Sequence, residues 1–277
     1  MMNKIHIPTP EQLEQQSAEH QKYGSYKPLF WTTRPHRNQI VPGLSIGLAT
    51  PVRATGSLGV VLDYRGFPIG TSNAHVLPDN DWSEIICNPG TADWGLFTNE
   101  DRERLMLGLW VDSTLKGDLD FAFFNMDADI DPRRIVNRIG RFQSPVAAEP
   151  LHPEPGMEVI KVGRTTGIVR GIVTERTDVE LGYPTNLGGN QVKHLWEVKP
   201  KATRSNPNPE YSLAGDSGAA VWTKKDGRLH WVGTHCGGNR ERAFLSQEEQ
   251  IEEERGYMAD ATECFQWSGA SKVWGGV

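Results

Sequence analysis

Residues 215–222 read Gly-Asp-Ser-Gly-Ala-Ala-Val-Trp, a tight polar turn that leads directly into a short apolar run. A nucleophilic serine needs this arrangement, because its hydroxyl must lie on a sharp turn whose backbone N–H groups point at a developing oxyanion. Glycine at position 215 leaves the backbone free to turn its N–H inward, beside the N–H of Ser217. The same four residues also suit a plain surface turn, so this segment alone favours a structural interpretation.

Two further segments contain the partners that such a serine requires. His75 comes at the end of a predicted strand, where a histidine can equally be a structural residue. Asp120 opens the run Asp-Phe-Ala-Phe-Phe, so its carboxylate leads into a buried strand and needs a partner for its charge. An imidazole that donates one ring N–H provides that partner and keeps its other nitrogen basic. Asp118 points to the same face and competes for this role, but the apolar run begins directly after Asp120.

The chain from residue 40 to residue 240 alternates short apolar runs with turns that contain Gly, Pro and Asp. This pattern is typical of antiparallel β-structure and not of alternating strands and helices. A stretch rich in Pro, Glu and Ala near residues 145–155 separates two sets of strands. We therefore expect an all-β protein with a polar extension at 1–39, strand sets at 40–145 and 146–240, and a C-terminal helix and tail at 241–277.

Taken together, the three segments resemble the chymotrypsin-like serine proteases. The resemblance rests on the order His75, Asp120, Ser217, on their spacing, and on the contexts Ala-His-Val, Asp-x-Ala and Gly-Asp-Ser-Gly; it covers residues 40–240. It implies two antiparallel six-stranded β-barrels with a Ser-His-Asp triad in the cleft between them. It further implies an oxyanion hole formed by the N–H groups of Gly215 and Ser217, a protein or peptide substrate, and neither a cofactor nor a metal.

The segment Val232–Gly238 resembles the Gly-x-His-x-Gly-Gly of glutamyl endopeptidases and of viral proteases that cut after Gln or Glu. In those enzymes the histidine hydrogen-bonds the substrate side chain, which implies a preference for Glu or Gln here. A strand histidine without such a role is the alternative interpretation of His235. Tyr211 replaces the Asp of a trypsin-like pocket, which disfavours cleavage after Lys or Arg. The pocket residues implied by the resemblance are Tyr211, Ser212, Thr234, His235 and Gly237.

Composition narrows the remaining function classes. The net charge of −6 disfavours nucleic acid as a partner, and no apolar run approaches the ~18 residues of a membrane-spanning helix. The three cysteines, Cys87, Cys236 and Cys264, are widely spaced, and the N-terminus lacks the apolar stretch of a secretory signal. We therefore expect free thiols and a cytoplasmic location. Two other functions stay open: a catalytically silent module that binds peptides or a partner, and an esterase or transacylase.

Three further motifs predict local structure. Ile40–Gly43 is faintly similar to the new N-terminus of activated trypsin-like zymogens, which would pair with Asp216, although entry into a strand is the favoured interpretation. Capping boxes at residues 9–12 and 246–249 predict two short helices, the second of which ends near Arg255. Residues 163–167, Gly-Arg-Thr-Thr-Gly, predict a hairpin turn, with an anion-binding turn as the alternative.

Overall fold

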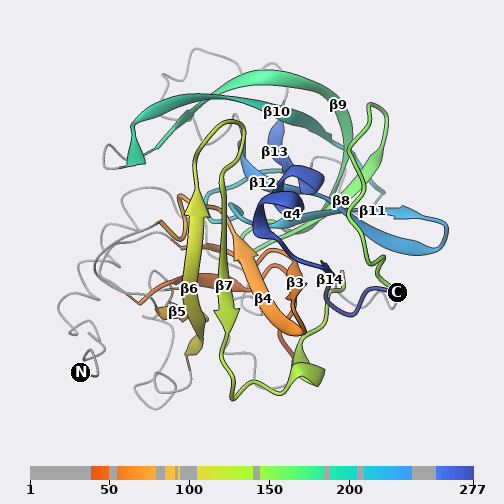
Figure 1. Cartoon of the computed structure of the whole chain (residues 1–277). Coiled ribbons are helices and arrows are strands. Elements are labelled where there is room, and N and C mark those ends of the chain that lie inside the picture. Colours follow the sequence, from red (N-terminus) through yellow and green to blue (C-terminus); the bar gives the residue numbers. More distant parts are fainter. Residues whose placement is uncertain are drawn as a thin grey trace.

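The computed structural model describes residues 39–49, 55–78, 85–90, 93, 105–139, 144–183, 187–204, 209–238 and 254–277. These residues form two antiparallel sheets, and their single α-helix is α4 (Ala261–Ser268), close to the C-terminus (Figure 1). A short 3-10 helix, η2 (Pro132–Arg134), follows the first group of strands. The predicted all-β class is confirmed. The N-terminal extension, the capping box at residues 9–12 and that at residues 246–249 lie outside the described residues.

The first sheet carries most of the N-terminal half of the described chain. Its strands are β1 (Ser45–Leu48), β2 (Thr55–Ser57), β3 (Val61–Tyr64), β4 (Phe67–Ser72), β5 (Ile85–Cys87), β6 (Met106–Thr114), β7 (Phe121–Met126) and β14 (Lys272–Val273). They are ordered β14-β3-β4-β7-β6-β5-β1-β2. The resemblance implied a first barrel of six strands, whereas this sheet has eight in the described part of the chain. One of the additional strands is the C-terminal β14, which pairs with β3.

The second sheet closes into the expected six-stranded barrel. Its strands are β8 (Glu158–Gly163), β9 (Gly167–Gly182), β10 (Asn190–Pro200), β11 (Ala220–Lys225), β12 (Arg228–Gly238) and β13 (Gly256–Asp260), ordered β10-β13-β12-β11-β8-β9. The sixth strand, β13, comes from the segment interpreted from the sequence as helix and tail. Glu254 and Arg255, where the predicted charged helix ends, are not helical. Instead, α4 begins after β13, where the Asp260 side chain accepts a hydrogen bond from the N–H of Thr262.

One buried apolar cluster joins the two sheets and fixes their relative position. It contains Leu62, Ile69 and Phe121 from the first sheet together with Trp222 and Trp231 from the second. The ring centroids of Phe121 and Trp231 are 6.2 Å apart. Burial of such aromatic side chains is among the largest stabilising contributions in a core, about 3–5 kcal/mol for truncation to alanine. Because Phe121 directly follows Asp120, this packing also fixes the start of β7 against β12.

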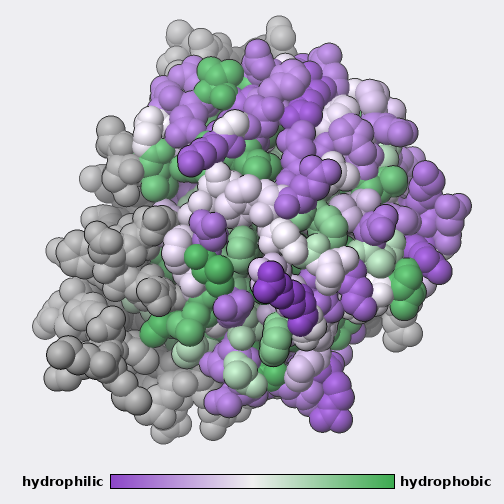
Figure 2. Space-filling view, in the orientation of Figure 1, coloured by the Kyte–Doolittle hydropathy of each residue, from purple (hydrophilic) through white to green (hydrophobic). Residues whose placement is uncertain are grey.

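On the face shown in Figure 2, hydrophobic residues form small separate patches among hydrophilic ones. Cys87, Cys236 and Cys264 are free and buried. Within the described ranges, no helix has the length and apolar character needed to cross a bilayer.

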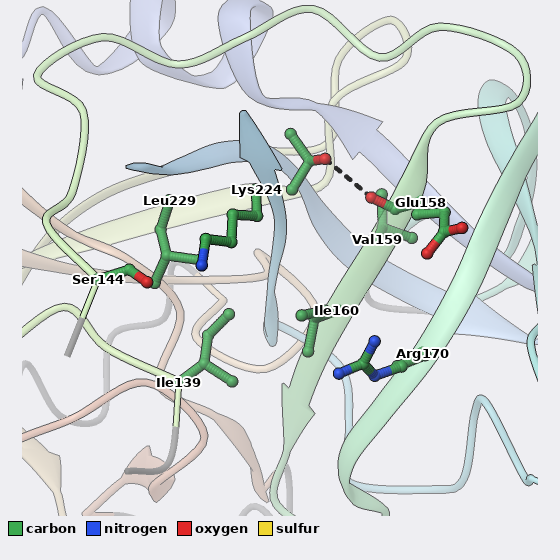
Figure 3. A pocket seen from close by; sticks show the side chains of 9 residues that line it. Ile139, Ser144, Glu158, Val159, Ile160, Arg170, Lys224 and Leu229 are labelled. Carbon is green, nitrogen blue, oxygen red and sulfur yellow. Dashed lines mark hydrogen bonds between the residues drawn. The ribbon is translucent and has the colours of Figure 1, made fainter. Parts of the chain in front are cut away.

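A cavity of about 400 Å³ lies against strands β8, β9, β11 and β12 (Figure 3). Its walls carry charges of both signs, from Glu158, Arg170 and Lys224, around the apolar side chains of Ile139 and Leu229. In its wall, the Thr223 hydroxyl on β11 donates a hydrogen bond of 2.8 Å to the Glu158 carbonyl on β8. None of the residues predicted to take part in catalysis lines this cavity.

Candidate active site

The pairing of β4 with β7 brings His75 to Asp120. Ser72 lies opposite Ala122 in the antiparallel register, so the chain that continues beyond β4 passes the residue that precedes β7. There it makes one tight turn, in which the N–H of Leu77 donates to the carbonyl of Asn73. His75 Nδ1 is 2.6 Å from Asp120 Oδ2, and the backbone N–H of His75 donates to Oδ1 at 3.2 Å. Both oxygens of the carboxylate therefore bind the same residue.

Asp120 is completely buried, yet its surroundings favour the ionised form. Burial opposes ionisation, but the charge of His75 and hydrogen bonds from its ring and backbone outweigh this effect and hold the pKa of Asp120 below its usual range. The His75 side chain keeps about a fifth of its surface exposed. The hydroxyl of Tyr183 also lies 3.1 Å from Asp120 Oδ2. The competing carboxylate, Asp118, instead binds the Arg176 guanidinium and the backbone N–H of His194.

The turn that carries Ser217 packs against the first sheet. Gly215 and Gly218 have φ angles of +94° and +88°, which glycine adopts without strain. The backbone N–H of Ser57 donates a 2.8 Å hydrogen bond to the carbonyl of Ser217. A Cβ atom on Gly56 would lie 2.6 Å from that carbonyl oxygen and 2.6 Å from the side chain of Val76. The serine turn and the residue next to His75 thus meet around Gly56, where only glycine fits.

The carbonyl groups that precede the two predicted oxyanion donors are both held in place. The Thr165 hydroxyl donates to the Ala214 carbonyl at 2.7 Å, and the N–H of Ala219 donates to the Asp216 carbonyl at 3.0 Å. In a trans peptide the C=O and N–H groups point in opposite directions. Anchoring these carbonyls therefore fixes the directions of the N–H groups of Gly215 and Ser217, which is what a preorganised oxyanion site requires.

The side chain of Asp216 points away from this site into the second barrel. Its carboxylate is completely buried and lies 2.8 Å from the Lys161 ammonium, which is also completely buried. The other donors are the backbone N–H groups of Leu213, Thr165 and Thr166, and the Thr166 hydroxyl. A carboxylate at this depth is stable because a cation and several hydrogen bonds surround it.

The structure contradicts the zymogen interpretation of Ile40–Gly43. The N–H of Ile40 donates to the Arg134 carbonyl at 2.7 Å, and Ile40 forms a parallel bridge with Ile135. The Asp216 carboxylate forms its ion pair with the Lys161 ammonium instead. The physical reason is that the buried Asp216 carboxylate is already paired with a buried cation, the Lys161 ammonium on β8.

The five predicted pocket residues lie around the same stretch of β12. The Ser212 hydroxyl is 2.8 Å from His235 Nε2, and the Tyr211 ring stands edge-on to the His235 ring, with centroids 5.9 Å apart. His235 is completely buried, and this burial, followed by the charges of Lys161 and His75, holds its pKa well below the usual range. Thr234 is buried in the pairing of β12 with β11 and β13.

A cavity of about 270 Å³ opens beside His75. Gly237 lines it, but Tyr211, Ser212, Thr234 and His235 do not. Its other walls come from Cys236 and Gly238 on β12, from Tyr257 on β13, and from the end of β9 with the turn after it, at residues 179–183. The cavity thus lies between the two sheets, with His75 on one side and the C-terminal end of β12 on the other.

Sequence reasoning missed Lys161, Thr165 and Tyr183. Lys161 lies just before the Gly-Arg-Thr-Thr-Gly segment and Thr165 lies within it, and the sequence predicted this segment only as a hairpin or anion-binding turn. It is the β8–β9 hairpin, and the anion that its backbone binds is the carboxylate of Asp216. For Tyr183 the sequence holds no local signal, because its partner lies 63 residues away in the other sheet.

Replacing Lys161 by methionine tests the role of the buried ion pair. Lys161→Met keeps the side-chain length but leaves the Asp216 carboxylate buried without its cation, so we expect the free energy of unfolding to fall by about 3–5 kcal/mol. Urea denaturation followed by tryptophan fluorescence measures this change. Lys161→Arg retains the charge and should lose less. A methionine variant as stable as the wild type would show that Asp216 does not depend on this pair.

Comparison with known proteins supports the fold. No protein-family model matches the sequence, and neither does any curated protein. Among solved structures, a glutamic acid-specific serine protease that uses a histidine triad in substrate binding is 15% identical, with a TM-score of 0.56, over 85% of this chain and 100% of that one. Thermobifida fusca protease A is 12% identical, with a TM-score of 0.54 over 85% and 99% of the two chains. Cellulomonas bogoriensis chymotrypsin is 16% identical, with a TM-score of 0.52 and the same coverage. The chain has the chymotrypsin-like serine protease fold.

Proposed function

We propose that this protein is a serine endopeptidase that acts through Ser217, His75 and Asp120. The observation that carries the proposal is the 2.6 Å contact between His75 Nδ1 and the buried Asp120 carboxylate, on a fold shared with serine proteases. A carboxylate that accepts from Nδ1 fixes the tautomer in which Nε2 is free to take a proton. The anchored peptides that precede Gly215 and Ser217 support the second requirement, a fixed pair of donors.

The proposed reaction is acyl transfer to water in two steps. Ser217 Oγ attacks the scissile carbonyl while His75 Nε2 takes its proton, and the N–H groups of Gly215 and Ser217 bind the resulting oxyanion. His75 then gives this proton to the leaving amine, and an acyl-enzyme forms on Ser217. In the second step water loses a proton to His75 and attacks the acyl carbonyl, and Ser217 leaves with that proton. Asp120 stays ionised throughout and stabilises the imidazolium.

Two alternatives use the same fold without this chemistry. A silent binding module has no physical need for a buried, ionised carboxylate that fixes an imidazole. An esterase or transacylase would share the triad and differ only in the acyl donor or acceptor. The first alternative is separated by a test of the serine itself, and the second by the substrates that are turned over.

Labelling of Ser217 tests the proposed function most simply. A fluorophosphonate probe should modify the wild-type protein at one site, because the activated hydroxyl attacks phosphorus as it would attack a carbonyl. Ser217→Ala should abolish the label, whereas Ser113→Ala, which removes a half-buried serine on β6, should leave it unchanged. Mass spectrometry of the intact protein and of its peptides measures both. An unlabelled wild type, or a label that persists in Ser217→Ala, would contradict the proposal.

For the substrate side chain, we propose a preference for Glu or Gln, recognised through His235 and Ser212. The buried neutral imidazole implied by the lowered pKa carries one ring N–H, and its Nε2 already shares a hydrogen bond with the Ser212 hydroxyl. A neutral donor set of this kind suits the amide oxygen of Gln or one carboxylate oxygen of Glu. The glutamic acid-specific serine protease among the similar folds adds weight to this preference.

Replacing His235 tests the preference. In His235→Ala, kcat/KM for peptides with Glu or Gln before the scissile bond should fall by about 10²-fold or more, because a site built to hydrogen-bond a polar group discriminates strongly. Turnover of matched peptides with Leu at that position should fall far less. His230→Ala, on the same strand, provides the control. An equal loss on all peptides would assign His235 to the core alone.

A further inference from the structure

A tyrosine of the second barrel touches the Asp120 carboxylate of the first sheet. Tyr183 directly follows β9, and its backbone is fixed by a hydrogen bond from its N–H to the Gly189 carbonyl at 3.2 Å. Its hydroxyl lies 3.1 Å from Asp120 Oδ2, the same oxygen that binds His75 Nδ1. The Tyr183 ring lies beside that of His75, with centroids 5.7 Å apart. One side chain therefore contacts both members of the pair.

The chemistry of the site makes Tyr183 the donor in this contact. Tyr183 is 8% exposed. Burial, followed by the nearby Asp120 charge, raises the pKa of the phenol far above its usual range, so the hydroxyl keeps its proton. An ionised carboxylate offers only acceptors. The Tyr183 O–H therefore donates to the charged Asp120 carboxylate.

The β9–β10 hairpin that positions Tyr183 is itself attached to the loop that precedes Asp120. Lys193 on β10 is 1% exposed, and its ammonium donates to the carbonyls of Gly117 at 2.9 Å, Leu119 at 3.1 Å and Leu115. The same ammonium lies 6.0 Å from the centre of the Tyr183 ring. In Figure 1 the connection between β6 and β7, which contains this loop, rises toward β10.

A second contact of the hairpin acts on the same loop. Asp118 accepts from the backbone N–H of His194 at 2.9 Å and from the Arg176 guanidinium at 3.1 Å. Arg176 lies on β9 and His194 on β10, opposite strands of the hairpin. The segment from Leu115 to Asp120 is thus bound at several points by one element of the other barrel.

We propose that Tyr183 is a positioning residue that fixes the Asp120 carboxylate from the opposite barrel. By sharing this carboxylate, it weakens the electrostatic interaction between Asp120 and the His75 imidazolium. The role of the pair in catalysis rests on the proposed function, but the hydrogen bond itself does not. Two donors share Oδ2, so the Tyr183 hydroxyl draws negative charge away from the oxygen that faces His75. Removing it should concentrate charge on that oxygen and favour protonated His75. The charged and titratable groups around the pair include Tyr183, Lys193, Cys236 and His235, and Glu180 and Tyr257 line the cavity beside His75.

Titration of the His75 ring by NMR tests this inference. In Tyr183→Phe, which keeps the ring and loses only the hydroxyl, we expect the pKa of His75 to rise by about half a unit or more. The ring nitrogen signals are assigned by their loss in His75→Gln. Tyr64→Phe removes a tyrosine hydroxyl on β3, away from the pair, and should leave the titration unchanged. This readout requires no turnover, so it stays valid even if the protein hydrolyses nothing.

Kinetics provide the second measurement. If the proposed function holds, the acidic limb of kcat/KM against pH should move upward in Tyr183→Phe by the same amount, and kcat should fall several-fold. A loss of kcat with both the NMR titration and the acidic limb unmoved would overturn the positioning role and leave Tyr183 as packing. A moved NMR titration in a protein that the fluorophosphonate probe does not label would uphold the hydrogen bond and reject the proposed function alone.

Discussion

A buried ionised carboxylate constrains the whole site. Asp120 has no exposed surface, and a charge at that depth is stable only where donors surround it. The ring and backbone N–H groups of His75 come from the same sheet, and the Tyr183 hydroxyl comes from the other barrel. The hydrogen bonds to this one carboxylate therefore form only when the two halves of the molecule are correctly placed relative to one another. The packing of Phe121, immediately after Asp120, on Trp231 stabilises the same placement by apolar contact.

A second buried carboxylate organises the serine turn by the same physical rule. Asp216 is surrounded by Lys161 and by the backbone of the β8–β9 turn, and its own peptide orients the N–H of Ser217. The two carboxylates have different roles: Asp120 orients an imidazole, and Asp216 fixes the backbone next to Ser217. In the uncut chain, the Lys161 ammonium on β8 already pairs with the Asp216 carboxylate, so this carboxylate has a cation without a newly cut N-terminus.

Much of this arrangement follows from local patterns in the sequence. The all-β class is evident from short apolar runs between turns, and His75, Asp120 and Ser217 stand in contexts that short segments reveal. Lys161 and Tyr183 could not be predicted in the same way, because their roles arise from partners 55 and 63 residues away. Strand β13 was missed because a charged run precedes it and predicted a helix that would stop at Gly256. Its five residues form a strand because their backbone hydrogen-bonds with β10 on one side and with β12 on the other.

The Asp120–His75 contact is tested most directly by proton NMR of the imidazole Nδ1–H in the intact protein. A strong charge-assisted hydrogen bond of this length should produce a signal far downfield of the amide region. That signal should change with protonation of the ring and disappear in Asp120→Asn and in His75→Gln, while Asp118→Asn leaves it in place. A spectrum without such a signal, or one in which only Asp118→Asn removes it, would contradict the account given for this site.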